Sequence, residues 1–351
     1  MSVLSPRGFI PPYILDRIIR NGSHRQRECA SGTLVHVQQL LPNPGAPHRQ
    51  SGITLLPKTG QPGLPLRNIH DAHQLMQLPG TEVRSEGQPP TGDAAVDEAY
   101  DALGATYELF WQVYGRDSID GHGFPLVGTV HYGDGYENAF WNGAQMVFGD
   151  GDGEIFHRFT RSLDVVAHEL AHGITESEAG LVYFNQPGAL NESLSDVFGV
   201  LTRQFSLKQT ADQADWLIGA DLLTDRVQGV ALRSMANPGT AYDDPVLGKD
   251  PQPGHMRDFI VTRDDNGGVH LNSGIPNRAF YLAAVAMGGY AWEKAGRIWY
   301  DTLCDRRLSN DADFSAFARL TLDAAGRIFG AAGGERMAVE QAWADVGVEL
   351  T

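Results

Sequence analysis

Apolar residues recur at helical spacing over much of the chain. Between Asp93 and Tyr114 they predict a helix packed against a sheet, with Val96, Tyr100, Leu103, Tyr107, Phe110 and Trp111 on its apolar face. The same spacing continues from Ser273 onward, and it predicts further helices at 292–308, 314–329 and 335–346. Shorter apolar runs at 127–132 and 138–148 predict strands. The helices therefore dominate the C-terminal part of the chain.

One predicted helix, Ser162 to Gly180, carries His168 and His172 four residues apart. Ser162 suits the N-cap and Gly180 the C-terminal stop. Residues four apart lie on one helix face, so the two imidazoles converge on one point, as zinc ligands do. Glu169, directly after the first histidine, is the expected general base of a metallohydrolase. The alternative is a surface helix with two solvated histidines.

The next segment, 188–198, has the period of a second helix and favours the metal-site interpretation. Its Glu192 follows His168 by 24 residues and could supply a third protein ligand. Asp196, one turn later on the same face, could accept the second ring N–H of a ligand histidine, and Asn191 could serve the other histidine. Alternatively, Asp196 is a charge on the helix surface.

The residues from 168 to 199, HELAHGITESEAGLVYFNQPGALNESLSDVFG, resemble the zinc-site region of the thermolysin-like neutral metallopeptidases. Similar patches occur at 138–143 (NAFWNG), 146–153 (MVFGDGDG), 233–235 (RSM) and 265–274 (DNGGVHLNSG). The resemblance extends from about Arg67, whose segment 67–83 resembles the opening strands of the mature peptidase, to the C-terminus. The first fifty residues resemble the shorter leaders of protealysin-like precursors, which carry a Pro-Pro motif, here within 10–15 (IPPYIL).

The resemblance implies an α+β, two-domain thermolysin-like fold: a β-rich N-terminal domain and an α-helical C-terminal domain, with the zinc helix between them. We expect a propeptide at 1–52, an N-terminal peptidase domain at 53–180 and a C-terminal domain at 181–351. The implied activity is a zinc endopeptidase made as a latent precursor. Its partners would be peptide or protein substrates and its own propeptide in cis.

The same resemblance implies roles for further residues. Tyr183 and His270 would stabilise the oxyanion, with Asp265 orienting His270. Arg233 would hold a substrate carbonyl. An edge strand would pair with the substrate backbone through Asn138 and Ala139. An apolar pocket, formed by Phe156, Phe159, Val165, Ile218 and Leu232, implies cleavage on the N-terminal side of apolar residues.

Two departures from the family pattern modify these expectations. Phe159 is bulkier than the usual leucine, which implies a narrower pocket that prefers smaller apolar groups. The acids of the family's double calcium site are mostly replaced, by Arg203, Leu217 and Ala220, and Val230 takes the place of an acid in a second calcium loop. We therefore expect calcium dependence to be weak or absent, with Arg203 pairing instead with Asp164 and Asp215.

Composition excludes several other classes. The net charge of −16 argues against nucleic acid as a partner, and no apolar run is long enough to span a membrane. No ordinary secretory signal is recognisable, so the expectation is secretion without a standard signal peptide or, less favoured, a cytoplasmic location. We expect a monomer.

The first fifty residues carry a net charge of +4, which leaves −20 on the remainder. An amphipathic pattern after Pro12 favours electrostatic docking of this leader on the acidic body; the alternative is a disordered basic tail. The Pro- and Gly-rich stretch 43–66 is typical of a linker. Cys29 either ligates the zinc as a latency switch or packs as an ordinary thiol.

Two other functions remain open. A zinc aminopeptidase would use the same ligands, but its strand carries an acid that grips the substrate's amine, whereas the strand here reads NAFWN. A zinc-dependent binding module, with the leader permanently bound, is the second alternative.

Overall fold

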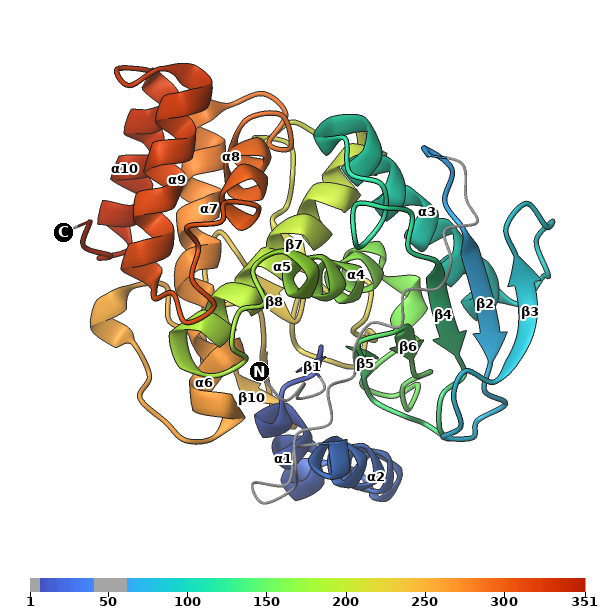
Figure 1. The fold of residues 1–351 in the computed structure, drawn as a ribbon. Coiled ribbons are helices and arrows are strands. Elements are labelled where there is room, and N and C mark those ends of the chain that lie inside the picture. The colour runs from blue at the N-terminus through green and yellow to red at the C-terminus, as the bar shows by residue number, and fades with distance from the viewer. Residues whose placement is uncertain (1–6, 41–61, 351) are drawn as a thin grey trace, which may run out of the picture.

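The computed structural model describes residues 7–40 and 62–350 (Figure 1). A sheet-containing lobe and a helical lobe flank two central helices, α4 (Leu163–Glu178) and α5 (Asn185–Leu207). A small two-helix leader lies against both lobes at the lower side of Figure 1. This two-domain α+β arrangement confirms the expected fold class.

The first lobe is built on one six-stranded sheet. The strand order is β1 (Arg7–Gly8), β5 (Ala139–Trp141), β6 (Met146–Phe148), β4 (Leu126–Val130), β2 (Arg67–Asp71) and β3 (Thr81–Ser85). Strands β6, β4 and β2 run parallel, whereas β1 pairs antiparallel with β5. The leader thus contributes one of the two edge strands of the sheet, next to β5 (Figure 1).

Helix α3 (Ala94–Tyr114) packs on this sheet and on α4, as its apolar face predicts. The side chain of Asp93 accepts hydrogen bonds from the Ala95 and Val96 amides, which caps the helix. Gly115, with φ of 69°, ends it in the left-handed region that glycine adopts without strain.

The two central helices place the functional side chains. Helix α4 begins directly after Ser162, follows the short η1 (Phe159–Arg161), and is ended by Gly180 at φ of 56°. Helix α5 is longer than the predicted 188–198, because apolar residues on its inner face continue to Leu201 and Phe205. The two helices lie side by side, which brings their polar residues onto one site.

The second lobe packs its helices around aromatic side chains. Trp299 and Trp343 stack with ring centroids 6.0 Å apart at the centre of this core. The helices are α6 (Asp265–Asn272), α7 (Gly274–Met287), α8 (Ala295–Leu303), α9 (Phe314–Phe329) and α10 (Gly334–Asp345). Its short elements are β7 (Leu217–Ile218), β8 (Arg233–Ser234), β9 (Asp243–Asp244), β10 (Gly248–Lys249) and η2 (Met256–Asp258).

Helix α8 is shorter than the predicted 292–308. The Gly-rich segment that carries His270 forms α6, in which Asn266, Gly267 and Gly268 have left-handed φ values between 51° and 80°. This distortion lets the segment turn sharply and carry His270 toward the central helices.

The leader forms two helices, α1 (Pro12–Asn21) and α2 (His24–Leu40), and it is docked on the body. Docking relies chiefly on apolar burial: Phe9, Ile10, Ile14, Leu15 and Ile18 are almost completely buried. The basic charge contributes at the edge, where Arg25 pairs with Asp134 at 3.3 Å. Most of the predicted linker lies outside the described residues. None of the described helices is long and apolar enough to cross a membrane.

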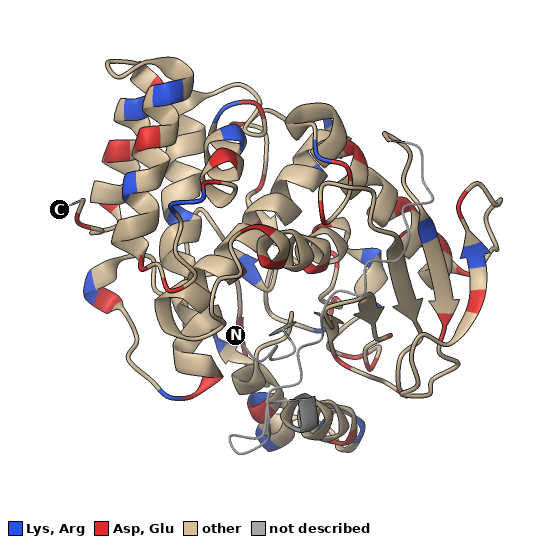
Figure 2. Cartoon of the chain, in the orientation of Figure 1, with Lys and Arg blue, Asp and Glu red and all other residues tan. Residues whose placement is uncertain are grey.

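Charges of both signs are scattered over the leader helices and the body (Figure 2). Because the leader is held chiefly by buried apolar side chains, electrostatic attraction is a secondary part of the docking that the sequence predicted.

Candidate metal centre and substrate cleft

The three predicted ligands meet in the space between α4 and α5. Ligand atoms of His168, His172 and Glu192 lie within 4.8 Å of one another, and all three residues are buried. His168 Nε2 and Glu192 Oε2 have no hydrogen-bond partner. A buried set of two imidazoles and a carboxylate facing one point fits a zinc ion and would leave a fourth position for water or substrate.

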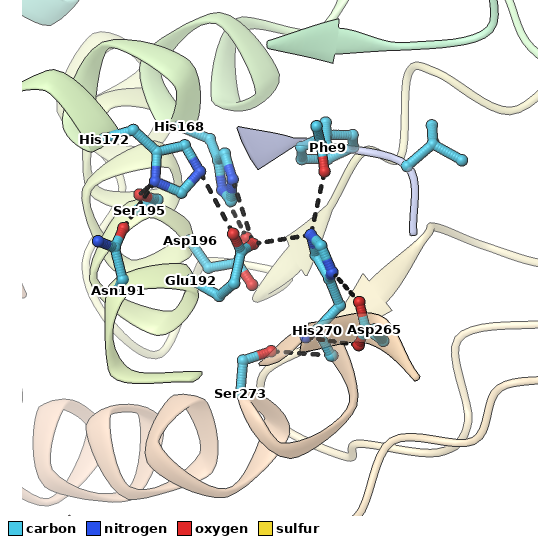
Figure 3. A network of polar contacts seen from close by, with 12 residues as sticks. Phe9, His168, His172, Asn191, Glu192, Ser195, Asp196, Asp265, His270 and Ser273 are labelled. Carbon is cyan, nitrogen blue, oxygen red and sulfur yellow. Dashed lines mark hydrogen bonds and ion pairs between the residues drawn. The ribbon is translucent and has the colours of Figure 1, made fainter. Parts of the chain in front are cut away.

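Both histidines are oriented by hydrogen bonds to their second ring nitrogen (Figure 3). His168 Nδ1 lies 2.9 Å from Asp196 Oδ1, and His172 Nδ1 lies 2.7 Å from Asn191 Oδ1. These bonds direct each Nε2 toward Glu192, at 3.5 and 3.4 Å. The structure therefore brings Asp196 and Asn191 to the positions that the sequence suggested.

Asp196 also links the metal centre to Arg233. The Nε and Nη2 atoms of Arg233 donate to the two Asp196 oxygens at 2.9 and 2.7 Å. Burial alone would raise the pKa of Asp196, but the charge of Arg233 and the bond to His168 hold it well below its usual range. The fully ionised carboxylate thus fixes a ligand and a candidate substrate-binding residue at once.

His270 enters the site from α6 (Figure 3). Its Nδ1 lies 2.5 Å from Asp265 Oδ1, and its Nε2 lies 3.4 Å from Glu192 Oε2. Burial lowers the pKa of His270, but the negative charges of Glu192 and Asp265 outweigh burial and raise it to about 9. The Tyr183 hydroxyl lies 3.2 Å from His270 Nε2 and donates to Glu192.

Glu169 is buried on the same helix as the two histidines, at the position directly after His168. The structure thus gathers the expected catalytic group from three separate parts of the chain: α4, the segment at Tyr183, and α6.

The leader fills the cleft beside this centre. The Phe9 amide donates to the Ala139 carbonyl at 2.9 Å, and the Ile10 amide donates to Asn138 Oδ1 at 2.8 Å. Arg233 Nη1 donates to the Phe9 carbonyl at 3.3 Å. The residues expected to hold a substrate backbone therefore hold the leader backbone.

The Phe9 side chain is the group buried next to the metal centre. Its ring lies edge-on to His168 with centroids 5.1 Å apart, and the Arg233 guanidinium lies 4.4 Å from its centroid. It belongs to the packed cluster that includes all five expected pocket residues, Phe156, Phe159, Val165, Ile218 and Leu232. The Phe9 ring lies close to Gly219, as does the Leu232 side chain. A pocket that prefers smaller apolar groups because of Phe159 stays a prediction.

Cys29 lies away from the metal centre. It sits on α2, close to Gly135 and Arg25, and burial raises the pKa of its thiol to about 11. It is not part of the ligand group found among the described residues. In this structure Cys29 packs against the body, and the segment around Phe9 is the part of the leader that reaches the cleft.

Arg203 is placed as expected with respect to one of its two predicted partners. Its Nη1 lies 3.1 Å from Asp215 Oδ2. Asp164 instead accepts hydrogen bonds from Ser162 Oγ and the Gly219 amide, both at 2.6 Å, because it is buried on α4 facing that turn.

Three contributors were missed from the sequence. Asn277 donates to Asp196 Oδ2 at 2.9 Å, and Ser195 Oγ lies 3.0 Å from His172 Nδ1. Phe9 is the third. Ser195 could have been found, because it lies one helical turn after Asn191; the other two depend on tertiary contacts.

Comparison with known proteins assigns the chain to a family. The catalytic domain of the thermolysin metallopeptidases matches residues 66–176, and their alpha-helical domain matches 179–348. The protealysin propeptide matches residues 7–49.

Individual relatives match this chain in sequence along almost its whole length. The chain is 62% identical over 345 residues to an extracellular metalloprotease of Pectobacterium carotovorum subsp. carotovorum, covering 97% of this chain and 96% of that protein. It is 50% identical over 346 residues to Protease PrtS of Photorhabdus sp., covering 98% and 92%. The solved precursor of protealysin from Serratia proteamaculans matches with a TM-score of 0.90 and 61% identity, covering 98% of this chain and 100% of that one. The chain therefore belongs to the thermolysin metallopeptidases and is a metalloprotease that carries a protealysin propeptide.

Proposed function

We propose that this protein is a latent zinc endopeptidase that cuts on the N-terminal side of apolar residues and is inhibited in cis by its leader. One observation supports this most directly. The leader segment 8–10 already uses the groups that a peptide substrate would need. Its backbone is hydrogen-bonded to Ala139, Asn138 and Arg233, and its Phe9 side chain packs in the apolar core of the cleft.

Each residue of the centre has a task in peptide hydrolysis. When bound, zinc polarises the substrate carbonyl and lowers the pKa of a water molecule. Glu169 takes the proton from that water and passes it to the leaving nitrogen. His270, held by Asp265, and Tyr183 donate hydrogen bonds to the carbonyl oxygen as negative charge develops on it.

Binding is divided between polar and apolar groups. Arg233 and Asn138 would fix the backbone of the residues after the cut bond, and Ala139 would accept the amide hydrogen at the bond itself. The pocket around Phe159 and Leu232 would take the side chain that follows the cut.

The leader would span 1–52, and the two peptidase domains 53–180 and 181–351. Cleavage in the segment that joins the leader to the body would allow the leader to leave. We infer that Phe9, rather than Cys29, is the residue that closes the cleft.

Three further properties belong to this proposal. Calcium dependence is weak or absent, since Arg203 pairs with Asp215 where the family holds calcium ligands. The protein is secreted rather than cytoplasmic, in line with relatives named extracellular metalloproteases. It acts as a monomer.

Zinc removal and peptide mapping test the proposal. Protein freed of its leader by a trace of trypsin would be stripped of zinc and then given back one equivalent. We expect casein hydrolysis to disappear and return, and the products to begin with apolar residues. Products that arise one residue at a time from free N-termini would instead indicate an aminopeptidase. Zinc binding without any hydrolysis would indicate a binding module.

A further inference from the structure

The leader is held by contacts that surround one particular peptide bond, Gly8–Phe9. On one side of the bond, the Gly8 carbonyl oxygen lies 3.0 Å from His270 Nε2 (Figure 3). On the other side, the Phe9 amide donates to Ala139 at 2.9 Å and the Phe9 carbonyl accepts from Arg233 at 3.3 Å. The carbonyl oxygen of Gly8 therefore lies against His270, the residue proposed to stabilise negative charge on that oxygen.

The side chains agree with this register. Phe9 is completely buried beside His168, a zinc ligand. Gly8 lies so close to the strand that an added Cβ would sit 2.6 Å from Asn138 Nδ2. Strand β1 also runs antiparallel to β5, with Gly8 opposite Phe140. The backbone therefore lies close to its partner strand on both sides of the bond.

We propose that Gly8–Phe9 is a processing site, which the protein hydrolyses in its own leader. This inference rests on the proposed function. Water adds to the Gly8 carbonyl carbon, the C–N bond breaks, and Glu169 transfers a proton from that water to the Phe9 nitrogen. The products are a peptide ending in the Gly8 carboxylate and a chain beginning with the Phe9 amine, so atoms and electrons balance with water as the only co-reactant.

The cut does not by itself release the leader. Phe9 and Ile10 stay buried after cleavage, and α1 continues to bury Ile14, Leu15 and Ile18. A product held this firmly continues to fill the pocket, so the trimmed precursor remains latent. Trimming at Gly8–Phe9 therefore precedes the cut that frees the enzyme. It leaves a new N-terminus at Phe9, which records which leader bond lies at the metal centre.

The test follows the full-length, zinc-loaded protein at neutral pH by intact-mass measurement and N-terminal sequencing, beside a Glu169→Ala copy. We expect the wild type to lose the mass of residues 1–8 and to gain a chain beginning at Phe9 before casein hydrolysis appears. The Glu169→Ala copy should stay whole at this bond.

The other outcomes separate this inference from the proposed function. Casein hydrolysis that appears while every leader fragment still contains the intact Gly8–Phe9 bond would overturn the processing site and leave the endopeptidase in place. A Phe9 terminus in the Glu169→Ala copy would assign the cut to another protease and overturn it as well. Failure to hydrolyse casein even after trypsin has removed the leader would overturn both.

The register can also be measured without turnover, in zinc-loaded full-length protein that carries Glu169→Ala. Pairing of Arg7 with Trp141 in the sheet should protect the Arg7–Gly8 bond from trypsin. Phe9→Ser should make that bond several-fold more sensitive by removing the buried ring. Val35→Ala, at a position 53% exposed on α2 of the same leader, is the matched control and should behave as the Glu169→Ala parent. Equal sensitivity of Arg7–Gly8 in all three proteins would overturn the register.

Discussion

Asp196 connects three elements at the candidate site. It accepts hydrogen bonds from a zinc ligand, from Arg233 and from Asn277, which come from three different elements. Because it is buried, its charge depends on these donors, and they depend on it. A single carboxylate therefore links the candidate metal centre to the candidate substrate-binding residue Arg233.

Asp196→Asn tests this coupling. The amide keeps the shape but removes the charge facing Arg233 and weakens the bond that orients His168. We expect zinc affinity to fall about 10- to 100-fold, as for other residues that orient metal ligands. Competition with a zinc chelator measures it, with the exposed Asp345→Asn as control. Unchanged affinity in Asp196→Asn would show that His168 is oriented without it.

Glu169→Ala separates catalysis from metal binding. The carboxylate is assigned to proton transfer rather than to the ligand set, so zinc content should stay at one per chain. Turnover should drop by about 100- to 10,000-fold, the range for loss of a general base. Metal analysis and casein hydrolysis are measured on the same sample after trypsin has removed the leader, with Glu340→Ala as control. Loss of zinc from Glu169→Ala would instead make Glu169 structural.

At the scale of elements, helix α2 covers an acidic pair formed by the buried Glu137 and the half-buried Asp152. Both carboxylate oxygens of Glu137 and Asp152 Oδ2 lack a hydrogen-bond donor, and the Glu137 amide donates to Thr33 Oγ1 on α2 at 2.9 Å. Burial, aided by Asp152 and only partly offset by Arg25, raises the pKa of Glu137 to about 9. Cys29 also faces this group from α2. Glu137 is therefore protonated at neutral pH and can donate to Asp152.

This pair predicts a pH dependence of precursor stability. Glu137 titrates near pH 4.3 when unfolded and near 9 when folded, so its contribution is fully present below about pH 4 and is lost as pH rises toward 9. The test is made in full-length protein that carries Glu169→Ala, which serves as the parent. Because Gln stays neutral, the melting temperature of Glu137→Gln should exceed that of its parent, by an amount that grows from pH 5 to pH 8.5. The control is Asp345→Asn, which removes the charge of an exposed acid on α10. Parallel melting curves for Glu137→Gln and its parent at both pH values would contradict the acidic pair.

A second prediction at this scale concerns calcium. The ion pair of Arg203 and Asp215 joins α5 to the segment before β7. We propose that it takes the place of the carboxylate-rich site that calcium needs. A calcium-selective chelator should leave the melting temperature of the full-length protein unchanged. A sharp drop on chelation, reversed by added calcium, would refute this.

Elements also explain how far the sequence could predict the site. The metal ligands could be predicted because they are close in sequence. The two histidines share a face of α4, and Glu192 lies on α5, the next helix of the chain. Phe9 could not be predicted, because its place depends on pairing with a strand about 130 residues later. For Asn277 the contact spans 81 residues. The hypothesis that Cys29 is a latency switch could not be decided from the sequence, because the docking of α2 places this thiol next to Gly135.

At the scale of the whole molecule, the leader both completes the sheet of the first lobe and blocks the cleft. The leader supplies an edge strand to the sheet of the first lobe, fills the pocket beside the metal centre, and contacts His270 from the second lobe. It thereby bridges both lobes with apolar side chains that would otherwise face water. Removal of the leader is thus expected to free the cleft without dismantling either lobe.

The most direct test of a leader-inhibited zinc endopeptidase is to follow casein hydrolysis and intact mass together in one sample of full-length protein. We predict no hydrolysis while the leader is attached or still bound, and a rise in step with its loss that a zinc chelator abolishes. Full activity with the leader still docked, or no activity once it has gone, would contradict the account.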